Sequence, residues 1–251
     1  MIASGRPHGP VAVAFTPDEE TGLGIAGFDV EGFGAAYAYT VDGGELGELS
    51  YENFNACEAT LDFHGVNVHP GSAKNTMVNA SLLAMEFNAM LPAAETPRQT
   101  EGYEGFFHLE EMAGDVARAR LVYIVRDHDA ARFEARRDQL RHITKVMNER
   151  WGEGAVALTL RDQYRNMKEK IAPYPFLIEN ARAAMRAAGF EPFDAAVRGG
   201  TDGAQLCYRG LPCPNLCTGG FAFHGPFEHI AAEDMELCAR MLEELICLPR
   251  E

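Results

Sequence analysis

The sequence lacks several patterns that assign a chain to a functional class at once. It has no uninterrupted apolar run of about 18 residues, so it predicts no transmembrane helix. Its opening residues, Met1 to Pro7, lack the apolar stretch of a secretory signal. Lys and Arg number 22 against 37 Asp and Glu, and the net charge of −15 disfavours general binding of nucleic acids or acidic membranes. We therefore expect a cytoplasmic protein that acts on a small molecule.

Paired metal-binding cysteines are also lacking. Six cysteines occur, mostly in or beside apolar segments, and none forms a Cys-x-x-Cys arrangement. Cys213 and Cys217 come closest to a metal knuckle, but no second pair exists and the residues between them suit a buried strand. The pattern therefore predicts buried free thiols at all six positions, which are Cys57, Cys207, Cys213, Cys217, Cys238 and Cys247.

What the sequence does contain is an alternation of apolar segments and polar turns typical of an α/β protein. With 251 residues, 47% of them hydrophobic, it can hold one large domain or two small ones. Val11 to Phe15 predicts a short buried strand, and Ala35 to Val41 predicts a second that ends in Asp42-Gly43-Gly44. In open parallel sheets the loops after the strands converge, so a site is expected where these strands end.

The spacing of apolar residues along the sequence changes at about residue 57. The apolar spacing now predicts strand, helix, strand, strand, helix and strand, which is the order of a ferredoxin-like sandwich. The strands are expected at 59–64, 106–112, 121–125 and 155–160, and the helices at about 77–91 and 130–151. Residues 57–162 are therefore predicted to form an inserted α+β domain.

Helices and short strands alternate again after the insert. Pro175 to Ala188 predicts a helix ended by Gly189, followed by strands at 194–197 and 215–218 and a terminal helix at 233–247. Residues 1–56 and 163–251 are therefore predicted to form one α/β domain, with a mixed, largely parallel sheet, that the insert interrupts.

The segment Thr16-Pro17-Asp18-Glu19-Glu20 carries the clearest chemistry. Neighbouring side chains leaving a strand diverge, so Glu20 can bind a metal ion while Glu19 stays unligated and takes the proton of an attacking water. Asp42 stands before two glycines that let a ligand approach, and His224 lies in a loop with little charged company. Glu20, Asp42 and His224 together offer the oxygen and nitrogen ligands that zinc prefers.

Each of these residues also has a plain structural interpretation. Glu-Glu pairs are common on solvated surfaces, and an aspartate before glycines or a lone histidine is often structural. Arg198 precedes two glycines and suits either a substrate carboxylate or a helix cap or salt bridge. His69 lies in a turn of the insert and is either a surface histidine or a group that approaches the site when domains or subunits close.

Taken as a set, these segments resemble the peptidase T family of tripeptide aminopeptidases, which belongs to a larger group of dinuclear-zinc metallopeptidases. The resemblance covers nearly the whole chain. It is carried by Phe15 to Glu20, Tyr39 to Gly44, Glu48 to Asn55, Asn67 to Lys74, Glu101 to Gly105, Arg198 to Gly203 and Thr218 to Gly225.

The resemblance implies a role for each candidate. Glu20 and His224 would bind one zinc ion, Asp42 the other, and Glu19 would be the general base. Arg198 would hold the carboxylate of a tripeptide substrate. The resemblance also implies that His69 stabilises the oxyanion when the insert closes as a lid, and that the insert pairs subunits into a homodimer.

The chain departs from the family pattern in one respect. The family needs a His-x-Asp pair and a metal-bridging aspartate ahead of the Thr16 segment, and neither occurs here. We therefore expect the carboxyl-terminal portion of such an enzyme, with weak zinc binding and little activity alone, and with strands of the missing part beside residues 11–15. A truncated gene, a split enzyme, a catalytically silent association module and a related dipeptidase or amidohydrolase remain alternatives.

Overall fold

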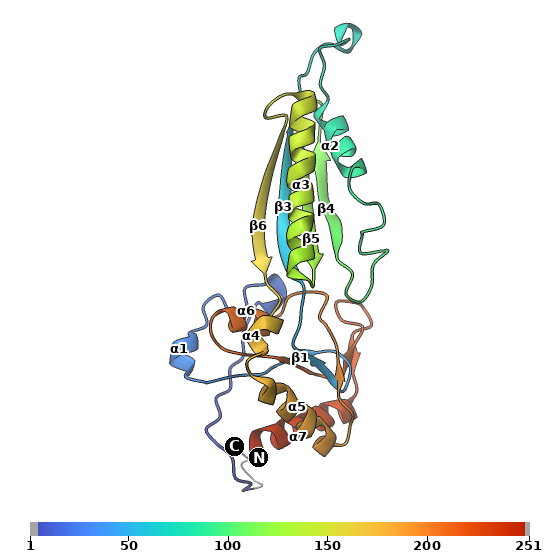
Figure 1. Cartoon of the computed structure of the whole chain (residues 1–251). Helices are drawn as coiled ribbons and strands as arrows, with labels where there is room; N and C mark the ends of the chain where they lie inside the picture. The colour runs from blue at the N-terminus through green and yellow to red at the C-terminus, as the bar shows by residue number, and fades with distance from the viewer. Residues whose placement is uncertain (1–4, 249–251) are drawn as a thin grey trace. The chain divides into compact units, whose positions relative to one another are not determined.

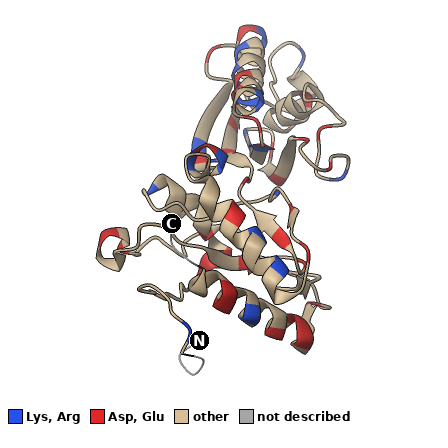
Figure 2. Ribbon diagram, turned by 60° about the horizontal axis from the view of Figure 1, so that its bottom comes forward, with Lys and Arg blue, Asp and Glu red and all other residues tan. Residues whose placement is uncertain are grey.

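A computed structural model describes residues 5–248, which fold into two compact units. Unit 1 comprises Met1–Asn53 and Arg165–Glu251, and unit 2 comprises Phe54–Tyr164. Unit 1 is thus interrupted once in sequence, whereas unit 2 is continuous. Acidic residues are distributed over helices and loops of both units (Figure 2), as the strongly negative net charge requires.

Unit 2 is a four-stranded antiparallel sheet packed against two helices (Figure 1). The strands lie in the order β4-β5-β3-β6, and helix α2 follows β3 while α3 follows β5. This order is the ferredoxin-like arrangement predicted from the sequence, so this prediction is confirmed. The bounds are β3 Asn55–His64, α2 Ala80–Ala89, β4 Phe106–Gly114, β5 Arg118–Asp127, α3 Ala130–Trp151 and β6 Val156–Tyr164.

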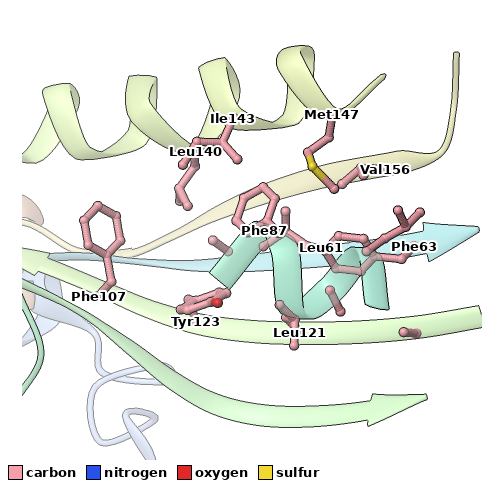
Figure 3. Close-up of a cluster of buried hydrophobic side chains, with 14 of the residues drawn as sticks. Leu61, Phe63, Phe87, Phe107, Leu121, Tyr123, Leu140, Ile143, Met147 and Val156 are labelled. Atoms are coloured by element: carbon pink, nitrogen blue, oxygen red, sulfur yellow. The ribbon is translucent and has the colours of Figure 1, made fainter. Parts of the chain in front are cut away.

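Buried and more exposed residues alternate along the central strands β3 and β5, and this alternation builds the core of unit 2. Every second residue of β3 from Cys57 to Phe63 is buried, and the same period of two continues on β5. Leu140, Ile143 and Met147 of α3 point toward this face of the sheet (Figure 3). Burying a side chain of this size contributes about 1.5–3 kcal/mol, so the face holds the helices on the sheet.

Unit 1 is built on a short mixed sheet in the order β1-β8-β2-β7. β1 pairs with β8 in parallel and β2 pairs with β7 in parallel, whereas β2 and β8 are antiparallel. The strands are β1 Thr40–Gly43, β2 Glu48–Ser50, β7 Phe193–Asp194 and β8 Asn215–Cys217. A separate antiparallel ladder joins β9 (Gly220–Phe221) to β10 (His229–Ile230).

The helices of unit 1 include a packed pair, α5 and α7. α5 has Pro175 in its first turn and ends at Gly189, whose positive φ of 106° closes it, which are the start and stop signals expected from the sequence. The bounds are α1 Val30–Phe33, α4 Lys168–Ile171, α5 Pro175–Ala188, α6 Asp202–Tyr208 and α7 Ala232–Cys247. Leu49, Met185, Leu216 and Met241 are among the buried core residues.

Two expectations about the first strands are wrong. Val11 to Phe15 forms no strand, and Val13 and Phe15 are 72% and 95% exposed. A strand needs a hydrogen-bonded neighbour, and within residues 5–248 no segment pairs with this one. The second strand is shorter than predicted, since β1 covers only Thr40–Gly43 and therefore contains Asp42 instead of ending before it.

The cysteines agree with expectation except at Cys247, which is only partly buried. All six are free thiols, and five of them are buried. Burial raises the pKa of Cys207 to about 11 and that of Cys213 to about 12, so these thiols stay protonated and unreactive. Within the described part of the chain, no helix combines the length and apolar character needed to cross a membrane.

Neighbouring leucines of α2 allow a direct test of this core. Leu83 is 2% exposed and belongs to the unit 2 core, whereas Leu82 is 60% exposed. We expect Leu83→Ala to lower the free energy of unfolding of unit 2 by about 2–5 kcal/mol, and Leu82→Ala to change it by less than about 0.5 kcal/mol. Equal effects of the two changes would contradict the packing described.

Urea unfolding followed by tryptophan fluorescence measures this difference in unit 2 specifically. The only tryptophan of the chain, Trp151, ends α3, and its indole Nε1 donates to Glu86 Oε2 of α2 at 3.1 Å. Its emission therefore reports separation of the two helices.

Candidate active site

The Glu19–Glu20 pair lies on a tight turn of unit 1 and not at the end of a strand. Glu19–Thr21 forms a single 3-10 turn, η2. It is closed by hydrogen bonds from Gly22 N to Glu19 O at 2.7 Å and from Leu23 N to Asp18 O at 3.2 Å. Asp18 has φ 61° and Gly22 has φ 73°, so a left-handed residue stands on each side of the turn. Aspartate tolerates this conformation better than most residues, which explains its place here.

His224 is held by a second strained loop, between β9 and β10. Ala222 and His224 have φ values of 55° and 60°. The His224 backbone N–H donates to Glu228 Oε2 at 2.9 Å, and the loop closes further through Gly225 N to Ala222 O at 3.2 Å. Four described residues other than glycine have positive φ, and three of them lie in these two loops. Such backbone strain gathers at functional sites.

The fold brings Glu20 and His224 together. His224 Nε2 lies 3.1 Å from Glu20 Oε2, although 203 residues separate them in the chain. Both side chains are more than 70% exposed, so their attraction contributes little to stability. The two loops therefore hold Glu20 and His224 in place. The contact between these two side chains is too weak to hold the loops. These are the two residues that the sequence analysis assigned to one metal ion.

Asp42 lies nearby on β1. Its backbone N–H donates to Asn215 Oδ1 on the neighbouring strand β8 at 3.2 Å. The next residue, Gly43, permits close pairing of the strands, because a Cβ at that position would stand 2.7 Å from Leu216 O. The side chain of Asp42 is exposed and contributes negative charge to the surroundings of Glu19.

Burial and neighbouring negative charges raise the pKa values of two carboxylates, Glu19 and Asp42. Partial burial, followed by the charges of Asp42, Asp202 and Glu20, raises the pKa of Glu19 to about 7, and His224 opposes this shift. Desolvation and the charges of Glu20 and Asp202 raise the pKa of Asp42. A group of carboxylates that disfavour one another's ionisation is a place where a cation is electrostatically favoured.

Asp202 was not assigned a role in the sequence analysis, although the segment Arg198 to Gly203 was singled out. It opens helix α6, is only 4% exposed, and accepts a hydrogen bond from Thr16 Oγ1 at 2.9 Å. Its other oxygen, Oδ1, is buried without a hydrogen-bond partner. The one signal in the sequence was a carboxylate between Thr201 and Gly203 at the start of a helix, which also fits an ordinary helix start.

The remaining two candidates lie elsewhere in the chain. Arg198 is half-buried in the unit 1 segment that follows Val197, which forms an isolated parallel bridge to Asn53. His69 belongs to unit 2, where it is exposed and its Nδ1 accepts from Gly71 N at 3.1 Å, so it caps the short 3-10 turn η3 (Pro70–Ser72).

The donors present fit a metal ion in type but not in number. Carboxylate oxygen and imidazole nitrogen suit zinc, which binds in proteins through a tetrahedral set of ligands. Among residues 5–248, no group of three or more His, Cys, Asp or Glu side chains surrounds one point. Glu20 and His224 alone do not complete a metal site.

Curated proteins with sequences similar to this chain share one description. The chain is 53% identical over 238 residues to peptidase T from Bacillus cereus strain B4264, which covers 95% of this chain and 58% of that protein. It is also 53% identical over 244 residues to peptidase T from Listeria monocytogenes serotype 4a, covering 97% and 60%. The chain is similar in sequence to peptidase T. It spans about three fifths of the length of these peptidase T relatives.

Solved structures agree with this similarity at the level of the fold. The aminopeptidase PepT from Bacillus cereus ATCC 10987 matches with a TM-score of 0.84 at 22% identity, over 98% of this chain and 66% of that one. A tripeptidase from Staphylococcus aureus matches with a TM-score of 0.86 at 20% identity and the same coverage. Residues 51–155, most of them in unit 2, match the family described as Peptidase dimerisation domain.

We expect this chain to bind zinc weakly, because only two metal-binding side chains, Glu20 and His224, lie together. After dialysis against zinc and then against metal-free buffer, we expect less than one zinc ion per chain by elemental analysis. In a calorimetric titration His224→Ala should remove the residual binding, whereas His229→Ala should not, because the His229 ring stacks on Phe221 and His224 is the histidine that contacts Glu20. Stoichiometric retained zinc would show that further ligands complete the site.

Proposed function

We propose that this chain supplies part of the active site of a zinc-dependent aminopeptidase that releases the first residue of tripeptides. The observation that supports it best is the approach of Glu20 to His224 beside Glu19, whose pKa is raised to about 7. The peptidase T relatives and the tripeptidase of the same fold favour this activity and substrate class. A dinuclear metal-binding peptidase of the M20 family from Bacillus subtilis, similar in fold with a TM-score of 0.66 at 12% identity over 93% of this chain and 63% of that one, favours a metal requirement.

Each residue has a role in this proposal. Glu20 and His224 bind one metal ion, Asp42 binds the second, and Arg198 pairs with the carboxylate of the tripeptide. His69 of unit 2 donates to the oxyanion when the lid closes. When bound, the metal ions supply Lewis acidity that makes water a stronger nucleophile at neutral pH.

Glu19 carries the proton in this proposal. Near pH 7 its carboxyl is about half protonated, because partial burial and, after it, the negative charges of its neighbours raise its pKa to about 7. Positive charge beside it favours the carboxylate, which is the form that accepts the proton of the attacking water. The carboxyl group then returns this proton to the leaving amine, so one residue acts as base and then as acid.

Replacing Glu19 distinguishes its role in the hydrolytic step from a role in binding zinc. This test uses a full-length form in which the remaining part of a peptidase T relative is fused to this chain. We expect Glu19→Gln to lower kcat for tripeptide hydrolysis by at least about 100-fold, because the proton carrier is lost. The zinc content of the protein should stay the same, since Glu19 is not a ligand in this proposal.

Glu31→Gln provides the matched control for this change. Glu31 is an exposed residue of α1 in the same unit, and its substitution removes one negative charge without touching the turn. It should leave kcat unchanged. Full turnover of the Glu19→Gln form would contradict the role of Glu19.

A second proposal from a different class is that the chain is an association module without catalytic activity of its own. Two observations favour it: residues 51–155 match a family described as a peptidase dimerisation domain, and the described residues bring only two metal donors together. In both proposals unit 2 pairs with a second copy. The edge strands of its sheet, β4 and β6, offer backbone groups for such pairing.

Light scattering on the purified chain tests the pairing. The chain mass is 27.5 kDa, so a homodimer predicts twice this value, with dissociation on dilution. A single species of 27.5 kDa at all concentrations would contradict pairing through unit 2.

A further inference from the structure

The feature that the proposed chemistry leaves unused is Asp202, a buried carboxylate in a protein whose carboxylates are mostly exposed. Its backbone is fixed, because Asp202 opens α6 directly after Thr201, whose Oγ1 accepts from Ala204 N at 3.0 Å and caps the helix. Only 4% of the residue is exposed. The start of the helix therefore fixes the place from which the side chain extends.

From this position Asp202 contacts both flanks of the turn that carries Glu19 and Glu20. On one side, its Oδ2 accepts from Thr16 Oγ1 at 2.9 Å. On the other side it lies against Gly24, where a Cβ would stand 2.3 Å from Oδ2 and 2.6 Å from Oδ1. Only glycine permits this approach. Thr16 and Gly24 each lie three residues from the turn Glu19–Thr21, so Asp202 contacts the loop on both sides of it.

The energetic cost of this arrangement indicates that it does more than fill space. Asp202 Oδ1 is buried with no hydrogen-bond partner, and leaving a buried oxygen unsatisfied is unfavourable. Asp202 is also close enough to raise the pKa values of Glu19 and Asp42. A smaller neutral side chain would avoid both costs, so the carboxylate has to contribute something that such a residue cannot.

We propose that Asp202 is a positioning residue, which holds the Glu19–Glu20 turn by binding Thr16 on one side and packing against Gly24 on the other. The consequence for catalysis rests on the function proposed above. The positioning itself does not, because it is a property of the chain alone. Holding the turn fixes the direction of Glu20 toward His224, and keeps Glu19 in place without a direct bond to it.

Backbone dynamics measured by nuclear magnetic resonance on the full chain test this directly. In the parent protein we expect order parameters of the Glu19–Gly22 amides near the value of rigid backbone, about 0.85, like those of α5. In Asp202→Ala they should fall below about 0.6 while α5 keeps its value. Asp202→Asn should retain the rigid turn, because its amide oxygen still accepts from Thr16.

Two glycines of the same loop provide a matched pair. Gly24→Ala places a Cβ into the carboxylate of Asp202 and should mobilise the turn without any change of charge. Gly27→Ala adds the same methyl group where nothing lies within 4 Å, and should leave the turn rigid. Thr16→Val removes the hydrogen bond and should act like Asp202→Ala, so it decides the question if Asp202→Ala fails to fold.

A rigid turn in Asp202→Ala and Thr16→Val would overturn the proposal, as would equal mobility in Gly24→Ala and Gly27→Ala. In the full-length fused form, Asp202→Ala should lower kcat more than it changes KM, and Asp202→Asn should restore most of it. If the parent fusion has no peptidase activity, the proposed function fails, and the order parameters still decide whether Asp202 positions the turn.

Discussion

Gathering carboxylates in a partly buried place is the constraint on which the candidate site of unit 1 depends. Glu19, Glu20, Asp42 and Asp202 come from three separate stretches of the chain, and partial burial followed by the negative charges among them raises the pKa values of Glu19 and Asp42. Unassisted, four carboxylates would separate into solvent, because their contacts disfavour the charged form. His224 is the group that opposes this repulsion most directly, through its contact with Glu20. The rest of unit 1 supplies the stability that keeps the group together.

That stability comes from the buried core and the hydrogen bonds of the loops more than from attraction between the side chains of the site. Asp18, Ala222 and His224 occupy left-handed conformations, which cost free energy at residues other than glycine. The cost is offset by the buried core under the sheet and between α5 and α7, and by the hydrogen bonds that close each loop. An exposed Glu–His pair is too weak to replace these, so the geometry of the site exists before any ligand binds.

Unit 2 is stabilised in a different way, because the backbone hydrogen-bonding groups of its strands find partners within the unit. Its strands pair in long antiparallel registers, and Asp129 caps α3 by accepting from Arg132 N at 2.8 Å. One face of the sheet is covered by helices and the edge strands β4 and β6 each have one partner among the described strands. A domain of this kind can move or associate as a body, which is what a lid or a dimerisation domain requires.

The sequence by itself determined the elements whose signals are local. The bounds of α5 were predicted from Pro175 and Gly189, which mark its ends, and those of α3 from the spacing of its apolar residues. The ferredoxin-like order of unit 2 was predicted from the spacing of hydrophobic residues alone. This was possible because each of its strands finds its partners within the unit. The candidates Glu19, Glu20, Asp42 and His224 were recognised from residue type and resemblance.

Only the tertiary structure decided what depends on a distant partner. Val11 to Phe15 has the composition of a strand but forms none, because hydrogen bonding between strands is not a local property. The 3.1 Å approach of Glu20 to His224 depends on two loops that are far apart in the sequence. Asp202 gave no signal beyond that of a helix start, and its contacts with Thr16 and Gly24 exist only because α6 packs beside the turn.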